Sequence, residues 1–375
     1  MHLRFLFAAA MAFGCFCQSF AIKITHGPYL QQVGENEATI MWTTDKDALS
    51  WVETAPDDGR SFYAEEHPRH YQSLLGRKTT GRLHRITVTG LQKGTTYRYR
   101  IFSTEAKHDK GGGVTYGKTA STNVYSRKPL RLTTADNDAR SLHFITLNDV
   151  HADTAKLRRH ISRSFKYGDV DFVLFNGDMV NRFDADTTLY QGFIDTAVEL
   201  FAKETPFVMA RGNHETRGNA ALSYMDYFPS PTGQPYYLYR RGPVCFIVMD
   251  AGEDKPDNDI EYYGTGDYDN YRARQLEWVR QAVKDPLFTG AKYRIAVVHV
   301  VPANDTWHGS LHLRRLFMPV LNDAGIDLML CGHQHRYRLV APGEEGNNFP
   351  IVINSNDDLV DVKAGPGGLA WEIVK

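Results

Sequence analysis

The pattern of apolar residues changes abruptly near Ser141. From there to the C-terminus, short apolar runs alternate with segments in which apolar residues recur every three or four positions. Short apolar runs are typical of buried strands, and the spaced pattern is typical of helices. Helices placed between strands cover the faces of a sheet, so residues 141–375 are expected to form an α/β domain.

Within this domain the expected elements can be placed by residue number. Strands are predicted over 143–147, 171–175, 206–210, 244–249, 295–298 and 328–330, and helices around 157–165, 189–201 and 276–283. The last residues, 370–374, also have a strand-like pattern. Their strand either pairs with 351–354 or lacks a partner because the C-terminus is shortened.

Residues 22–134 show no long helical period and instead alternate apolar and polar residues between turns. The segments 84–89 and 96–101 alternate in this way on either side of a glycine-containing turn, 90–95. This pattern resembles a fibronectin type III sandwich, in which Tyr97 would be the corner tyrosine whose hydroxyl bonds back to the backbone. A generic β-sandwich is the alternative. The polar residues 135–140 are expected to link the two domains.

The first 21 residues are predicted to be a signal peptide. Arg4 provides a positive start, the apolar stretch 5–16 is too short to span a bilayer, and Ala21 closes a small-x-small cleavage site. The protein is therefore expected to be exported to the periplasm or the extracellular space, with no transmembrane segment in the mature chain. Lipid attachment at Cys15 or Cys17 is the alternative, but an aliphatic residue is missing three positions before Cys15.

Composition excludes several classes of partner and site. The formal net charge of -1 gives no electrostatic basis for binding nucleic acid or an anionic membrane. After removal of the signal peptide two cysteines remain, Cys245 and Cys331, and both lie in apolar runs. They are expected to be buried thiols, so neither a disulfide framework nor a cysteine metal site is predicted.

Side chains able to bind metals follow the apolar runs of the second domain. They are Asp149 and His151, then Asp178, then Asn213, His214 and Glu215, then His299, and finally His333 and His335. Loops at the carboxyl ends of strands are where open α/β sheets place their sites. Each motif alone could occur by chance, and a lone His299 would more often be a core histidine. Their joint occurrence predicts a centre of carboxylate, amide and imidazole ligands, which suits first-row transition metals.

The order Asp-x-His, Gly-Asp, Gly-Asn-His-Glu, His and Gly-His-x-His, spanning 149–335, resembles the calcineurin-like metallophosphoesterases. The β-rich domain in front of it, with Gly27-Pro28-Tyr29-Leu30 near its start, resembles the arrangement of purple acid phosphatases. The resemblance covers nearly the whole mature chain. It implies a catalytic domain of two mixed sheets packed face to face with outer helices, an αββα sandwich.

The resemblance also implies two metal sites that share one carboxylate. The first would consist of Asp149, His151, Asp178 and His335, and the second of Asp178, Asn213, His299 and His333. The ions would be divalent or mixed-valence Fe, Zn or Mn. Bridging by an anion is needed because two cations about 3.5–4 Å apart repel each other.

Three further residues would serve the reaction. His214 would face the phosphoryl group as a hydrogen-bond donor or general acid, with Glu215 orienting it. His308 would contact the substrate, since purple acid phosphatases place further histidines after the position of His299. The alternative for His308 is an exposed loop histidine.

Two positions depart from the purple acid phosphatase pattern. His151 replaces a glycine, and Asn181 stands where a metal-binding tyrosine is expected. No tyrosinate can ligate iron from position 181, so the charge-transfer colour is expected to be absent.

The sequence therefore predicts an exported enzyme that hydrolyses small phosphate monoesters by attack of a metal-activated hydroxide. A phosphodiesterase or nucleotide pyrophosphatase using the same metal pair is the alternative. A non-catalytic cell-surface binding module is a third possibility, and the intact ligand set argues against it.

Overall fold

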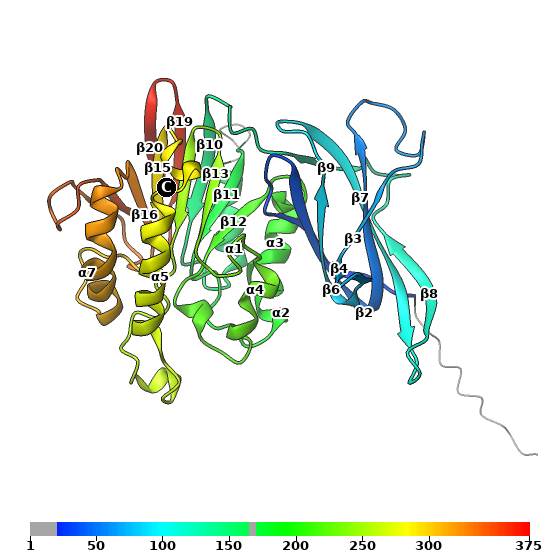
Figure 1. The fold of residues 1–375 in the computed structure, drawn as a ribbon, viewed down its shortest axis with the longest axis horizontal. Coiled ribbons are helices and arrows are strands. Elements are labelled where there is room, and N and C mark those ends of the chain that lie inside the picture. The colour runs from blue at the N-terminus through cyan, green and yellow to red at the C-terminus, as the bar shows by residue number, and fades with distance from the viewer. Residues whose placement is uncertain (1–20, 165–169) are drawn as a thin grey trace, which may run out of the picture.

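The computed structural model describes residues 21–164 and 170–375. Its N-terminal part is a seven-stranded sheet together with a separate two-stranded hairpin (Figure 1). The sheet contains β1 (Ile24–Gln31), β2 (Glu37–Pro56), β3 (Arg69–Tyr71), β6 (Thr80–Thr89), β7 (Thr96–His108), β8 (Val114–Ser121) and β9 (Leu130–Thr133). The hairpin is β4 (Ser73–Leu74) with β5 (Arg77–Lys78). The predicted signal peptide, with Cys15 and Cys17, falls almost entirely outside the described residues.

The long strand β2 organises this domain by changing partners along its length. It pairs with β1 and β6 in its first half and with β7 from Ala48 onward, with a register shift between Thr43 and Ala48. The sheet therefore folds over a core of its own, around the fully buried Trp42. The predicted tyrosine contact is present, because the Tyr97 hydroxyl accepts a 2.9 Å hydrogen bond from the Gln92 backbone N–H.

The second part of the chain contains two mixed sheets. One has the order β12-β11-β10-β19-β20 and the other the order β13-β14-β15-β16-β18-β17. The strands of the first sheet are β10 (Leu142–Leu147), β11 (Phe172–Asn176), β12 (Phe207–Ala210), β19 (Leu359–Gly365) and β20 (Gly368–Val374). Those of the second are β13 (Tyr237–Arg241), β14 (Val244–Val248), β15 (Tyr293–Val297), β16 (Leu328–Cys331), β17 (Arg338–Val340) and β18 (Ile351–Ile353).

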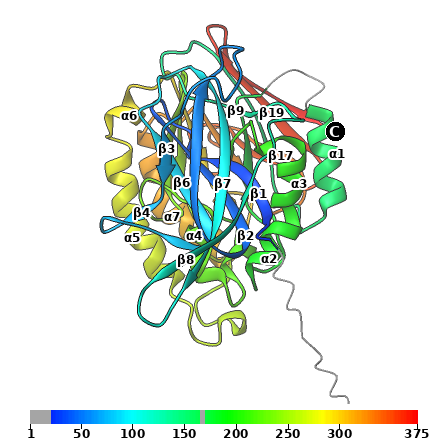
Figure 2. The ribbon, with the colours of Figure 1, turned by 90° about the vertical axis from the view of Figure 1, so that its right-hand side faces the viewer.

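Helices cover the outer faces of both sheets. On the first sheet lie α1 (Thr154–Ser164) and a continuous helical stretch made of α2 (Asp186–Leu189), η2 (Tyr190–Ile194), α3 (Asp195–Ala197) and η3 (Val198–Ala202). On the second lie α5 (Tyr268–Ala282) and α7 (His308–Asp323). Figure 2 shows α5 and α1 on opposite sides of the strands. Short elements complete the set: η4 (His214–Thr216), η5 (Ala221–Ser223), α4 (Tyr224–Tyr227), η6 (Ile260–Tyr262) and α6 (Pro286–Thr289).

A hydrophobic layer holds the two sheets together. It contains Phe144 and Phe172 from the first sheet and Phe246 from the second, with ring centroids 4.9–5.4 Å apart. Aromatic pairs at such separations are stabilised beyond the area they bury. The order of layers is therefore helix, sheet, sheet, helix, and the predicted fold class, an all-β domain followed by an αββα domain, is confirmed.

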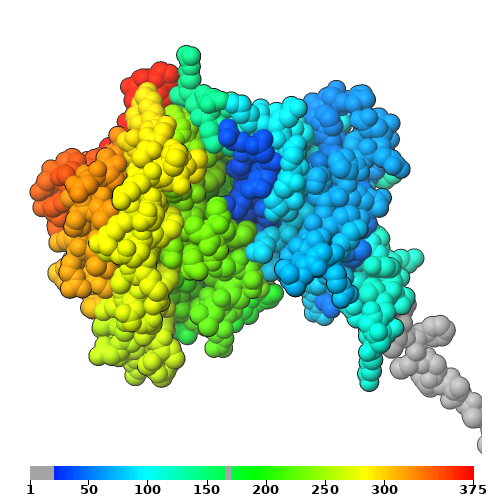
Figure 3. Space-filling view, in the orientation of Figure 1, coloured from blue at the N-terminus to red at the C-terminus, as the bar shows by residue number. Residues whose placement is uncertain are grey.

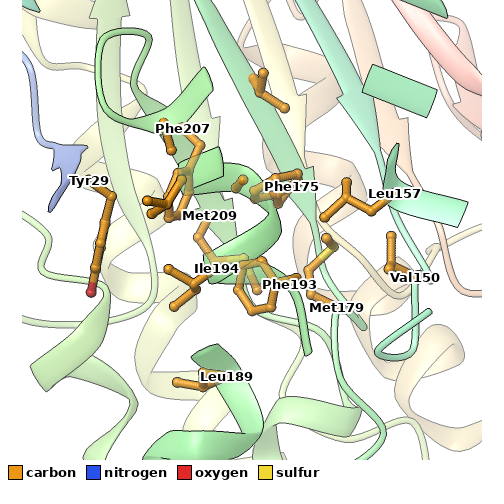
Figure 4. Close-up of a cluster of buried hydrophobic side chains, with 14 of the residues drawn as sticks. Tyr29, Val150, Leu157, Phe175, Met179, Leu189, Phe193, Ile194, Phe207 and Met209 are labelled. Carbon is orange, nitrogen blue, oxygen red and sulfur yellow. The ribbon is translucent and has the colours of Figure 1, made fainter. Parts of the chain in front are cut away.

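Strand β1 joins the two domains. In the space-filling view its segment lies between the N-terminal domain and the second domain (Figure 3). Tyr29 is fully buried and stacks on Phe207 of β12 at 5.7 Å (Figure 4). The Tyr99 hydroxyl donates to the carbonyl of Lys203 at 2.6 Å. The N-terminal domain is thus fixed to the helix-covered side of the first sheet.

Most of the predicted elements are present, and one pairing is corrected. The strand 370–374 is paired, but with β19 and not with 351–354. Strand β18 has no free edge for it, because β16 and β17 already lie on its two sides. Helix α7 was not predicted, and Phe165 lies outside the described residues. Cys245 and Cys331 are free, buried thiols as expected. Among the described helices, none is both long and apolar enough to cross a bilayer.

Candidate metal centre

The predicted ligands come from five loops that follow parallel strands. Strands β10, β11 and β12 run parallel in the first sheet, and β15 and β16 run parallel in the second. The carboxyl ends of parallel strands meet at one edge of their sheet. Because the two sheets pack face to face, both edges contribute to the same centre, and the structure brings Asp149, His151, Asp178, His299, His333 and His335 together there.

The backbone at this centre adopts an unusual conformation. Left-handed φ angles occur at Asp149 (55°), His151 (51°), Asp178 (54°), His333 (74°) and His335 (55°). This region is costly for residues with a Cβ, and such strain gathers at functional sites. Gly177 is required for the close approach of two of the loops, since a Cβ there would lie 2.5 Å from the His299 ring.

The first group of candidate ligands is Asp149, His151 and His335. The His335 Nε2 lies 3.1 Å from Asp149 Oδ1, and the His151 Nε2 lies 3.1 Å from the His335 Nε2. Burial raises the pKa of Asp149, but His299, His151 and His335 outweigh it and hold that pKa well below its usual range. The carboxylate is therefore charged, and two imidazole nitrogens converge beside it.

The second group is Asp178, His299 and His333. The His299 Nε2 lies 3.0 Å from Asp178 Oδ2, and its Nδ1 lies 2.6 Å from the carbonyl oxygen of Asn176. A carbonyl only accepts hydrogen bonds, so Nδ1 carries a proton and Nε2 faces the carboxylates. Burial lowers the pKa of His299, but Asp178 and Asp149 raise it to about 10. The surroundings thus favour positive charge at this point.

Apart from the histidine–carboxylate contacts given above, three buried atoms at the centre have no hydrogen-bond partner among the described residues. They are Asp149 Oδ1, His299 Nε2 and Asn213 Oδ1. Buried polar atoms nearly always form hydrogen bonds, so atoms from three different strands that lack them need an explanation. Oxygen and imidazole donors of this kind fit transition-metal ions. Asp178 belongs to the second group and also to a cluster with His151 and His214, which places it between the two groups.

His214 lies at the same centre, and its orientation differs from the prediction. Its Nε2 is 3.8 Å from Asp178 Oδ2, and its Nδ1 is 2.8 Å from the carbonyl oxygen of Asn181. The ring is therefore oriented by the Asn181 carbonyl and not by Glu215. Burial lowers the pKa of His214, and the carboxylate of Asp178 raises that pKa by a smaller amount.

Glu215 binds backbone N–H groups, whereas the prediction was that it orients His214. Its buried carboxylate accepts hydrogen bonds from the backbone N–H groups of Asp178 (2.9 Å), Met179 (2.7 Å) and Gly212 (2.9 Å). Burial and the charge of Asp178 raise the pKa of Glu215 to about 7. Glu215 thus ties the loop that carries Asp178 to the loop that carries Asn213.

His308 is placed in a separate cluster. It is the first residue of α7, and its Nε2 lies 2.8 Å from Asp269 Oδ1, with His312 at the same distance from that oxygen. No hydrogen bond or ion pair within the described part of the chain joins His308 to the metal-ligand residues. The structure gives the predicted substrate contact of His308 no support.

The sequence analysis missed residues that lie directly behind the ligands. Asp254 Oδ2 is 3.4 Å from the Nε2 of His333, and Glu253 Oε1 is 3.4 Å from the Nδ2 of Asn213. Both acidic residues follow β14, a buried apolar strand, which was the signal that could have identified them. Arg217, three residues after His214, binds Glu253.

The fold and centre define a class of metal-dependent phosphoesterases. Residues 142–337 match the family model described as calcineurin-like phosphoesterase, and residues 26–128 match the purple acid phosphatase N-terminal domain. The chain belongs to the calcineurin-like phosphoesterase family.

The chain is also similar in sequence to two other proteins. An uncharacterized protein of Mycobacterium tuberculosis is 26% identical over 374 residues, covering 89% of this chain and 66% of that protein. Acid phosphatase type 7 of Mus musculus is 27% identical over 229 residues, covering 59% and 47%. The chain thus spans about two thirds of the first relative (66%) and about half of the second (47%).

Two solved structures match parts of this chain at low identity and with low TM-scores. GAP50, described as the anchor in the inner membrane complex of Plasmodium, has a TM-score of 0.40 at 15% identity, covering 63% of this chain and 85% of that chain. Phosphopantetheinyl hydrolase of Mycobacterium tuberculosis has a TM-score of 0.39 at 13% identity, covering 59% and 91%.

Proposed function

We propose that the protein is an exported phosphomonoesterase that hydrolyses small phosphate esters at a two-metal centre. The observation that carries this proposal is the gathering of buried metal-binding atoms at one centre, where the His299 Nε2 lies 3.7 Å from Asp149 Oδ1 and 3.0 Å from Asp178 Oδ2. A binding module would gain nothing from burying two carboxylates so close to one ring, because like charges repel each other and buried charges cost free energy in the folded state.

The residues divide into two ligand sets. Asp149, His151, Asp178 and His335 would hold one ion, and Asp178, Asn213, His299 and His333 would hold the other. When bound, the ions supply Lewis-acid activation of water and of the phosphoryl group. Asp178 has the charge and the position needed to separate two cations, since it is buried and lies within reach of both groups.

His214 would donate a proton to the oxygen of the leaving group. Its Nδ1 proton is held by the Asn181 carbonyl, so Nε2 is the nitrogen directed to the centre. To donate, the ring must carry a second proton at Nε2, which it would pass to the leaving oxygen or share with a phosphoryl oxygen. Its half-exposed position gives that proton a route to solvent.

Export rests on the residues before Ile22. A positive start, a short apolar stretch and a small-residue cleavage site form the pattern of a secretory signal. A fusion of residues 1–21 to a reporter should be exported and cleaved, and a reporter that stays in the cytoplasm would contradict this part of the proposal.

The function is tested with metal-reconstituted protein and a panel of phosphate monoesters and diesters. We expect hydrolysis of monoesters that is lost on chelation and restored by adding the metal back. Preferential hydrolysis of diesters or of nucleotide pyrophosphate bonds would replace the proposal by its alternative. Absence of hydrolysis in protein that binds two ions would support a binding module.

A further inference from the structure

The Arg217 guanidinium lies beside His214 at the metal centre. The side chain is only 10% exposed, and its Nη1 lies 3.4 Å from the Nε2 of His214. Its Nη2 lies 3.6 Å from Asp254, which contacts the ligand His333. A buried cation is therefore placed next to the ring that is proposed to protonate the leaving group.

Glu253 fixes the plane of this guanidinium. Arg217 Nε donates to Oε2 and Nη2 donates to Oε1, both at 2.8 Å. The carboxylate is fully buried and is itself held by the Tyr262 hydroxyl at 2.6 Å and the Asp254 backbone N–H at 2.8 Å. Two parallel bonds of this kind impose geometry as well as attraction.

This clamp leaves one end of the guanidinium for another ligand. Nε and Nη2 are engaged by Glu253, while Nη1 lies 3.4 Å from the His214 Nε2, which cannot accept a hydrogen bond once it carries the proton for the leaving group. An Nη1 group carries two protons, so at least one remains to be satisfied. The Nη1 end of Arg217 thus lies beside the His214 Nε2.

The same carboxylate also orients a metal ligand. Asn213 Nδ2 lies 3.4 Å from Glu253 Oε1, so the amide turns its Oδ1 the other way, where it is buried and unpaired. Glu253 thus acts on both the proposed second metal site and on Arg217. A residue whose role was only to support its own loop would not need to contact both Arg217 and Asn213.

We propose that Arg217 binds a phosphoryl oxygen of the substrate through Nη1, beside His214, and that Glu253 is the positioning residue for Arg217 and Asn213. The inference rests on the proposed function of the centre. Charge accumulates on the equatorial oxygens of a phosphoryl group in transfer, and a fixed guanidinium stabilises it without reorganising.

The test compares Arg217→Ala and Arg217→Lys with the metal-loaded wild type. Removing one preorganised donor of this sort lowers kcat by about 10²–10³-fold. We expect that loss for Arg217→Ala together with an about 10–100-fold weaker affinity for inorganic phosphate, as a charge-assisted hydrogen bond is lost. Elemental analysis should still find two ions. Arg217→Lys should recover part of the loss, because it keeps the charge but not the forked geometry.

Arg158 provides a matched control. It forms a two-bond pair with Glu199, at 2.6 and 2.5 Å, on the exposed surface of the same domain. Arg158→Ala removes an equivalent pair away from the centre and should leave kcat and phosphate affinity unchanged. A similar loss of kcat and phosphate affinity in both variants would mean that Arg217 acts only through its charge or through stability. That result would overturn the inference.

Glu253→Gln tests the positioning role. Loss of an outer-shell partner lowers metal affinity by about 10–100-fold, so this variant should weaken one ion, whereas Arg217→Ala should not. At saturating metal, adding Glu253→Gln to Arg217→Ala should lower kcat no further. Independent, multiplying losses would overturn the positioning role.

Phosphate binding separates this inference from the proposed function. If the wild type binds two ions and inorganic phosphate but hydrolyses no ester, the proposed function fails. Calorimetry of phosphate binding still tests Arg217 in that case. Unchanged phosphate affinity in both Arg217 variants, with two ions bound, would overturn the inference whatever the activity. If Arg217→Ala does not fold, Arg217→Lys carries the comparison.

Discussion

The two halves of the metal centre differ in how far they are closed to water. In the half made by Asp149, His151 and His335, the side chain of His335 is 47% exposed and that of His151 is 18% exposed. In the half made by Asp178, His299 and His333, the corresponding values are 2%, 0% and 13%. One half is open on the histidine side, and the other is enclosed.

The histidine and amide side chains of the enclosed half are also better supported. Asn176 holds the His299 ring, Asp254 lies behind His333, and Glu253 orients Asn213. Outer partners of this kind fix the orientation of ligands and raise metal affinity. In the open half, His151 and His335 meet each other directly. We therefore expect the enclosed half to bind its ion more tightly and the open half to exchange its ion more readily.

The largest effect is expected from the residue shared by both halves. Asp178→Ala should remove both ions and abolish hydrolysis, because it deletes the one carboxylate that can separate two cations. Asn213→Ala should mainly weaken the enclosed half. Elemental analysis checks both variants. A single ion in fully loaded wild-type protein would contradict the comparison of an open and an enclosed metal site, since there would then be only one site.

A pair of histidine variants measures the difference between the halves. His299→Ala should weaken one ion by more than about 100-fold, beyond the cost of losing an outer-shell partner. His335→Ala should cost clearly less, because water can replace an exposed ligand. Two-site binding isotherms give both constants. Equal losses would show that burial does not distinguish the sites.

His214→Ala is expected to affect the rate without affecting either half. General acid help contributes about 10²–10⁴-fold, so kcat should fall by that range while two ions remain bound. The loss should shrink for nitrophenyl phosphate, whose leaving group departs without a proton. Equal losses for good and poor leaving groups would make His214 a stabiliser of phosphoryl charge. Loss of metal would make it a ligand.

The smallest change concerns the open half. Iron-loaded wild-type protein should show no visible tyrosinate band, because Asn181 replaces the expected tyrosine. The side-chain amide of Asn181 donates a 3.1 Å hydrogen bond to the His151 backbone carbonyl. The backbone carbonyl of Asn181 accepts a hydrogen bond from His214 Nδ1. Asn181→Tyr need not create a band, since His151 still occupies the centre. An absorption spectrum decides this, and a purple wild type would mean that another tyrosine reaches the first metal.

Local patterns in the sequence were enough to predict the order of most elements and the residues that gather at the centre. Strands such as β10 and β11 are short, largely apolar runs, and polar residues in a sharp turn follow each of them, as at Gly177-Asp178. Burial along a strand and the need for glycine at a close approach are both visible within a few residues. The α/β class follows from the same alternation of strands and helices, whereas the two packed sheets were implied by the family resemblance.

The contacts between distant segments were decided only by the tertiary structure. Strand β20 pairs with β19 because β18 is already flanked on both sides, which no local pattern records. Glu215 accepts from backbone 35 to 37 residues away, although its neighbour in sequence is His214. Arg217 and Glu253 are 36 residues apart. Such partners depend on which loops the two packed sheets bring to one edge, and that is a property of the whole fold.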